Sequence, residues 1–261
     1  MQIRLDAYAA SDVGAHRTVN QDAAFTASWA AAVADGVGGG PSGDLASAAL
    51  VHRLVAGRGR LPDAAGLDER LREANWDLRA LAERDGSLRG MATTFTGLFV
   101  GPGGELLLAH TGDSRAYLLR GGRFERCTRD DSYVQALVDS GVIGAEDAAS
   151  HPKRNIITAS FGGDEDDCPL VREVGAQAGD RWMLCSDGLT DYVPEDAVQQ
   201  AMRATSPAEA AAAAVGLALA ASTRDNVTVV VCDIVNAGTA HDEPLFFGSA
   251  AERFREELES A

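Results

Sequence analysis

Hydrophobic and polar residues show two periodicities along this chain, and each periodicity predicts one kind of secondary structure. Alternation with period two over residues 3–9 is typical of a half-buried strand. Further short strands are predicted at 23–26, 29–34, 93–100, 105–109, 116–119, 124–127, 170–174, 181–185 and 227–235. Apolar spacing and capping residues predict helices over 42–55, 67–84, 131–140, 194–203 and 207–221.

The grouping of these elements predicts the fold class. Glycine-rich turns at 101–104 and 121–122 separate neighbouring strands and indicate hairpins. Strands joined in this way pair antiparallel, unlike the strict alternation of strand and helix in a parallel sheet. We therefore predict an α+β fold with two packed antiparallel sheets covered by helices.

Composition and charge restrict the class of protein. The chain has 261 residues, of which 46% are hydrophobic and 24% charged, as in an ordinary globular protein. Its net charge of −16 argues against nucleic acid or an anionic membrane as a partner. Four cysteines without paired spacing favour neither a zinc site nor a disulfide framework. No signal-like or membrane-spanning run is present in the sequence, so we expect a cytoplasmic protein.

Acidic residues stand at the edges of five predicted strands: Asp22, Asp35, Asp113, Asp187 and Asp225. Gly36 follows Asp35 directly, and a residue without a Cβ lets its backbone carbonyl approach an ion closely. Carboxylate and carbonyl oxygens are the ligands that hard cations such as Mg²⁺ and Mn²⁺ prefer. A strand followed by a solvated turn would explain any one of these acids, whereas five of them indicate a shared cluster of ligands.

Six short motifs carry a resemblance to a known family. They are Arg17 with Asn20-Gln21-Asp22, Ala34-Asp35-Gly36, Met91-Ala92-Thr93-Thr94, Gly112-Asp113-Ser114-Arg115, Ser186-Asp187-Gly188-Leu189-Thr190-Asp191 and Asp225-Asn226-Val227-Thr228. In this order, over about residues 5–235, the motifs resemble the metal-dependent serine/threonine protein phosphatases of type 2C in their compact bacterial form.

The resemblance implies a fold, an activity and a set of partners. The fold would be a four-layer α-β-β-α sandwich, in agreement with the predicted layers. The activity would be hydrolysis of phosphoserine and phosphothreonine in proteins by a metal-activated water at a binuclear Mn²⁺ or Mg²⁺ centre. Phosphorylated proteins would be the partners, including a cognate bacterial serine/threonine kinase, and the enzyme would act as a monomer.

The resemblance also implies residue roles. Asp35 would bridge two tightly bound ions, the Gly36 carbonyl would bind one of them, and Asp187 and Asp225 would complete the pair of sites. Asp22 would act mainly through metal-held waters.

Two further roles complete the implied site. Arg17 would hold the substrate phosphate, because a planar guanidinium can donate to two phosphate oxygens. Asp113 and Asp191, together with Asp187, would hold a third and weaker ion.

Three positions depart from the family pattern: Gln21, Val37 and Ala92. Val37 replaces the histidine that is the putative proton donor in animal members. Either a metal-held water or His151 could then protonate the leaving group. His151, in a segment at 144–155 that resembles the family's mobile flap, is also a candidate for substrate binding.

Three other functions are alternatives to the one that the resemblance implies. A catalytically silent binding module would have lost metal ligands, and a phosphatase acting on a small ester stays open. A cysteine phosphatase would need a Cys-x₅-Arg loop, which Cys185 does not begin.

We assign residues 1–235 to the catalytic domain and 236–261 to a linker and a short helix. Loss of this tail is expected to leave catalysis on a small ester nearly intact.

Overall fold

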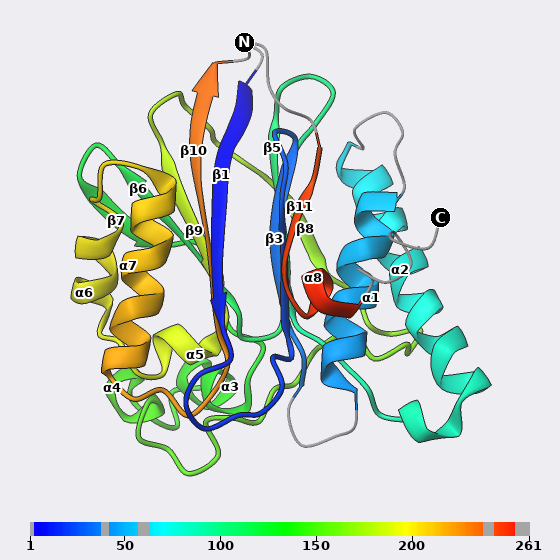
Figure 1. Cartoon of the computed structure of the whole chain (residues 1–261). Helices are drawn as coiled ribbons and strands as arrows, with labels where there is room; N and C mark the ends of the chain where they lie inside the picture. Colours follow the sequence, from blue (N-terminus) through cyan, green and yellow to red (C-terminus); the bar gives the residue numbers. More distant parts are fainter. Residues whose placement is uncertain (1–2, 38–41, 57–62, 237–242, 254–261) are drawn as a thin grey trace.

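The structure, a computed structural model, describes residues 3–37, 42–56, 63–236 and 243–253 (Figure 1). The strands are β1 (Ile3–Asp12), β2 (Asp22–Thr26), β3 (Ala30–Asp35), β4 (Phe95–Val100), β5 (Leu106–Thr111), β6 (Arg115–Arg120), β7 (Arg123–Arg126), β8 (Leu170–Val174), β9 (Arg181–Cys185), β10 (Val227–Asn236) and β11 (Leu245–Gly248). The helices are α1 (Gly43–Ala56), α2 (Ala64–Arg84), a 3₁₀ turn (Gly86–Leu88), α3 (Tyr133–Asp139), α4 (Ala145–Ala148), α5 (Asp187–Thr190), α6 (Glu195–Ala201), α7 (Pro207–Ala220) and α8 (Ser249–Arg253).

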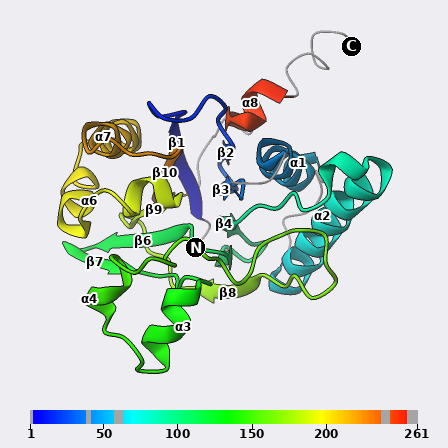
Figure 2. The same cartoon turned by 90° about the horizontal axis from the view of Figure 1, so that it is seen from below.

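Two antiparallel sheets face each other at the centre of the molecule. One has the strand order β1-β10-β9-β6-β7, and the other has the order β11-β2-β3-β4-β5-β8. Helices α6 and α7 cover the outer face of the first sheet, and α1 and α2 cover the outer face of the second (Figures 1 and 2). The α+β class and the four-layer α-β-β-α arrangement are therefore confirmed.

Strand β3 shows why an unbroken apolar run forms a central strand. Its small side chains alternate between two buried clusters, with Ala30, Ala32 and Ala34 facing the helix layer and Ala31 and Val33 facing the opposite sheet. All five are fully buried. A strand covered on both faces has no polar side to display, so period-two alternation disappears from its sequence.

The structure contains four elements that the sequence did not predict: the 3₁₀ turn Gly86–Leu88, helices α4 and α5, and strand β11. The first three are single turns, too short to show helical periodicity. Strand β11 precedes helix α8 in the tail, for which the sequence predicted a linker and a short helix. The described part of that helix ends at Arg253, and residues 254–261 lie outside the described residues.

Two further sequence predictions concern cysteines and membranes. All four cysteines are free, and Cys185 and Cys232 are buried. Among the described residues, no helix is both long enough and apolar enough to cross a bilayer.

Candidate metal centre and adjoining pocket

The acids predicted as ligands come from both sheets and meet at one end of the sandwich. Asp22 begins β2 and Asp35 ends β3, and the two are direct partners in the antiparallel register. From the opposite sheet, Asp187 follows β9, and Asp225 precedes β10. Asp113 lies in the turn between β5 and β6. The pairing of strands thus brings together residues that are far apart in sequence.

Hydrogen bonds fix Asp22 between the sheets. Ser186 Oγ donates to Asp22 Oδ2 at 2.8 Å, and the backbone N–H of Asp22 donates to Asn20 Oδ1 at 3.1 Å. Ser186 Oγ in turn accepts the Thr228 N–H at 3.0 Å. The Asp22 carboxylate is therefore held in one orientation by a strand end of the opposite sheet.

Backbone contacts place Gly36 beside Asp22. The Gly36 N–H donates to the Gln21 carbonyl at 3.1 Å, and the Gln21 N–H donates to Asn226 Oδ1 at 2.8 Å. A Cβ on residue 36 would lie 2.7 Å from the Gln21 carbonyl oxygen and would also collide with the Gly43 carbonyl. Only glycine fits this close approach of three backbone segments.

The carboxylates of the cluster are destabilised in their charged form. Burial raises the pKa of Asp22 to about 6 and that of Asp113 to about 7, with neighbouring acids adding to both. The pKa values of Asp35 and Asp187 are raised well above their usual range, first by burial and then by four neighbouring carboxylates in each case. Burial also raises the pKa of Asp191. Buried carboxylates that repel one another are stabilised either by taking up protons or by a compensating cation.

The donor chemistry fits a hard divalent ion. The carboxylates of the cluster repel one another electrostatically. Among the described residues, no three carboxylate, imidazole or thiol groups are arranged as the ligands of one metal ion. Their only donors are oxygens, which suit Mg²⁺ and Mn²⁺ rather than a soft metal. The residues present therefore fit the ions that the sequence predicted.

Arg17 lies at the edge of this cluster. Its Nη2 donates to Asp225 Oδ2 at 2.8 Å and its Nε donates to the Arg224 carbonyl at 3.3 Å. With 37% of its side chain exposed, Arg17 sits between the acids and solvent. The guanidinium is therefore open to solvent beside Asp225.

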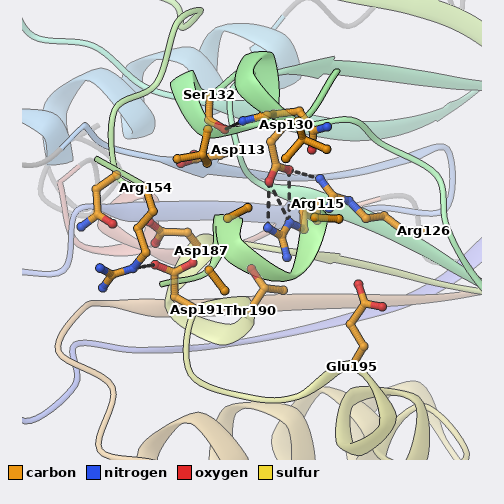
Figure 3. A pocket seen from close by; sticks show the side chains of 17 residues that line it. Asp113, Arg115, Arg126, Asp130, Ser132, Arg154, Asp187, Thr190, Asp191 and Glu195 are labelled. Atoms are coloured by element: carbon orange, nitrogen blue, oxygen red, sulfur yellow. Dashed lines mark hydrogen bonds and ion pairs between the residues drawn. The ribbon is translucent and has the colours of Figure 1, made fainter. Parts of the chain in front are cut away.

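A pocket of about 370 Å³ adjoins the cluster and is lined by Asp113, Asp187 and Asp191 on one side (Figure 3). Arg115 and Arg126 lie on the other side and both donate to the buried Asp130, Arg115 Nη2 at 2.7 Å from Oδ2. The rest of the lining includes side chains of α3 and α4.

One arginine of the predicted flap reaches this pocket. Arg154 Nε lies 3.5 Å from Asp191 Oδ2, and Arg154 and Asn155 both line the pocket (Figure 3). His151 does not line it; its Nδ1 accepts the Lys153 N–H at 3.1 Å and its ring lies 6.1 Å from that of Tyr133. Its predicted part in substrate binding therefore remains a prediction.

Several polar residues of this region were not predicted from the sequence, namely Arg115, Arg126 and Asp130 as pocket residues and Ser186 as the donor to Asp22. One signal was available, because Asp130 comes after a predicted strand, as Asp35, Asp113 and Asp187 do. The predicted hairpin between β6 and β7 brings Arg115 and Arg126 together, but no local pattern marks Asp130 as the acceptor that they share.

Comparisons with known proteins agree with this geometry. The profile of the family described as Protein phosphatase 2C matches residues 15–221. The serine/threonine protein phosphatase PstP of Mycobacterium tuberculosis is 39% identical over 248 residues, covering 94% of this chain and 48% of that protein. The chain therefore spans about half the length of this curated relative. The serine/threonine phosphatase stp of Listeria monocytogenes is 32% identical over 210 residues, covering 77% of this chain and 82% of that protein.

Solved structures share the fold. The crystal structure of M. tuberculosis PstP/Ppp superposes with a TM-score of 0.83 at 39% identity, covering 90% of this chain and all (100%) of that one. The catalytic domain of PstP in complex with two manganese ions gives a TM-score of 0.82 at 38% identity, with the same coverage. The resemblance carried by the six motifs is confirmed, and this chain belongs to the protein phosphatase 2C family.

Proposed function

We propose that this chain is a metal-dependent protein phosphatase that hydrolyses phosphoserine and phosphothreonine in proteins. The observation that carries the proposal is the convergence of five acids from both sheets on one end of the sandwich, where burial and mutual repulsion raise the pKa values of Asp22, Asp35, Asp113 and Asp187. The similarity to serine/threonine phosphatases supports the same reaction.

The residue roles in this proposal are those that the family resemblance implies. Asp35, Asp187, Asp225 and the Gly36 carbonyl would hold two ions, with Asp22 acting mainly through metal-held waters, and Asp113 and Asp191, together with Asp187, would hold a third. Two divalent ions supply Lewis-acid activation of a water for in-line attack on phosphorus. Mn²⁺ and Mg²⁺ both suit these ligands, and the manganese-bound relative supports Mn²⁺.

The chain's own groups complete the reaction. Arg17 would leave Asp225 to donate to the phosphate oxygens and offset their negative charge as the ester bond breaks. His151 would contact the substrate from the flap segment.

The biological setting is part of the proposal. We place the protein in the cytoplasm, because four free cysteines suit a reducing compartment. Its substrates would be phosphorylated proteins, with a serine/threonine kinase as the opposing enzyme, and it would act as a monomer.

The test is phosphate release from a phosphothreonine peptide with Mn²⁺, with Mg²⁺ and with excess chelator. We expect turnover with either metal, none in chelator, and none for Asp187→Asn. Asp166→Asn, at an exposed acid of another loop, is the matched control and should behave as wild type. Metal-independent turnover would contradict the proposal, and metal binding without turnover would favour the silent binding module.

A further inference from the structure

The C-terminal segment Leu245–Arg253 lies outside the residues matched by the family profile, yet it packs against the strand that carries Asp22. Strand β11 pairs with β2 over its full length, from Leu245 opposite Thr26 to Gly248 opposite Ala23. Helix α8 follows at once and lies against α1 (Figure 1). We call this segment the C-terminal clamp.

Ser249 reaches the backbone of Asp22. It is 1% exposed, and its Oγ donates to the Asp22 carbonyl at 3.0 Å. The Oγ of Ser47 on α1 lies 3.0 Å from the Oγ of Ser249 and donates to the Gln21 carbonyl at 2.6 Å. Each hydroxyl has a single proton to donate. Ser249 donates to the Asp22 carbonyl and Ser47 to the Gln21 carbonyl, so the two serines together bind the carbonyls of two consecutive residues.

The same carbonyls connect the clamp to Gly36. The Gln21 oxygen that accepts from Ser47 also accepts the Gly36 N–H at 3.1 Å. One short network therefore joins Ser249 to the backbone of two proposed metal ligands, Asp22 and Gly36. The carboxylate of Asp22 is held separately, by Ser186 from the opposite sheet.

Gly248 makes this approach possible. It has φ +61°, and a Cβ there would collide with the Asp22 carbonyl oxygen and lie 3.0 Å from Ser11 Oγ. No larger residue could bring the clamp so close to Asp22 without moving β2.

Side chains of both the strand and the helix attach the clamp to the rest of the domain. Phe246 stacks on His52 with ring centroids 4.2 Å apart, and Phe247 meets Tyr8 edge-on at 5.9 Å. Arg253 Nε donates to Asp44 Oδ2 at 2.7 Å, and Leu245 is 58% exposed. Ala250 is 2% exposed and belongs to the core cluster beneath α1, so the clamp is anchored in the core as well as placed beside Asp22.

We propose that the C-terminal clamp is a positioning element of the metal centre, in which Ser249 fixes the main chain of Asp22 and thereby sets metal affinity. The proposal rests on the proposed function, which makes Asp22 part of the metal centre. It also reverses the expectation from sequence that the tail is dispensable. Groups that orient a metal's ligands typically change metal affinity by roughly 10- to 100-fold when removed.

The first experiment measures Mn²⁺ binding by calorimetry and by electron paramagnetic resonance in the full chain. Ser249→Ala should weaken Mn²⁺ binding roughly 10- to 100-fold and alter the resonance signal of the bound ion. Arg253→Ala is the matched control, because it removes the attachment to Asp44 and leaves the contact with Asp22. It should bind Mn²⁺ as wild type does.

The second experiment removes the clamp and returns it. A chain ending at residue 242 should bind Mn²⁺ weakly, a chain ending at Arg253 should bind it normally, and a synthetic peptide of residues 243–261 should restore binding to the shorter chain. The same peptide with Ser249→Ala should not. Unchanged Mn²⁺ affinity in Ser249→Ala, with or without a lower melting temperature, would overturn the positioning role. Absence of Mn²⁺ binding in wild type would overturn the proposed function with it.

Discussion

Replacing Asp22 by asparagine should stabilise the protein when no metal is bound. Asp22 is 1% exposed, and its pKa rises from 3.8 to about 6, chiefly because burial removes the carboxylate from water. Since this pKa is higher in the folded than in the unfolded chain, ionisation favours unfolding. The penalty is absent below about pH 4, grows between pH 4 and pH 6, and is constant above that range.

The size of the effect follows from the same two pKa values. The difference between 3.8 and about 6, at about 1.4 kcal/mol for each pKa unit, corresponds to about 3 kcal/mol. Asparagine has nearly the same shape, carries no charge, and offers an oxygen that can still accept from Ser186. Its advantage at pH 7.5 should therefore reach about 3 kcal/mol in the free energy of unfolding, as an upper figure.

Urea unfolding in excess chelator, followed by tryptophan fluorescence at pH 4 and pH 7.5, measures this difference. The value at pH 4 reports any change in hydrogen bonding, and the further gain at pH 7.5 reports the charge alone. Asp166→Asn, at an exposed acid, is the control and should show no such gain. If Asp22→Asn gains nothing between pH 4 and pH 7.5, Asp22 is not a buried, destabilised carboxylate and the electrostatic reasoning fails.

Three other predictions concern the same site. Arg17→Ala should raise KM for phosphopeptides roughly tenfold or more with little loss of metal affinity, because the phosphate loses a charged donor; an unchanged KM with lost metal binding would place Arg17 in another role. Asp113→Ala should keep the fold and two tight Mn²⁺ sites but lower turnover, as calorimetry and an assay on one sample can show; loss of both tight sites would make Asp113 a core ligand. Binding of Mn²⁺ at pH 6 should release protons, since the pKa values of Asp22 and Asp113 are raised to about 6 and about 7. Calorimetry in two buffers of different ionisation enthalpy would measure this release, and its absence would contradict the inference that these acids are protonated at pH 6.

Much of the fold could be predicted from sequence because its signals are local. Strand β3 appears as an apolar run and α2 as a helical repeat, and each pattern survives without knowledge of its neighbours. Strand β11 could not be recognised, because it has four residues and exists as a strand through its pairing with β2. Its residues lie in the tail, for which the sequence predicted only a linker and a short helix.

The candidate site divides in the same way. Asp35 and Asp187 stand next to glycines after apolar runs, so their type and position indicated their role. The approach of Arg154 to Asp191 and of Ser249 to Asp22 depends on how separate segments fold back, and no local pattern records it.

The direct pairing of Asp22 with Asp35 makes the metal centre sensitive to the length of the turn between β2 and β3. Only residues 27–29 separate these strands, and the Ala27 N–H closes the turn by donating to the Ala30 carbonyl at 2.8 Å. If an inserted residue were taken up by a slip of β3 past β2 rather than by a longer turn, a different residue would lie opposite Asp22 and the side chains of β3 would turn to the opposite face. A slipped hairpin could still bury alanines on both faces, but it would separate the two carboxylates. Metal binding therefore distinguishes correctly paired molecules from misregistered ones that compactness alone would not reveal.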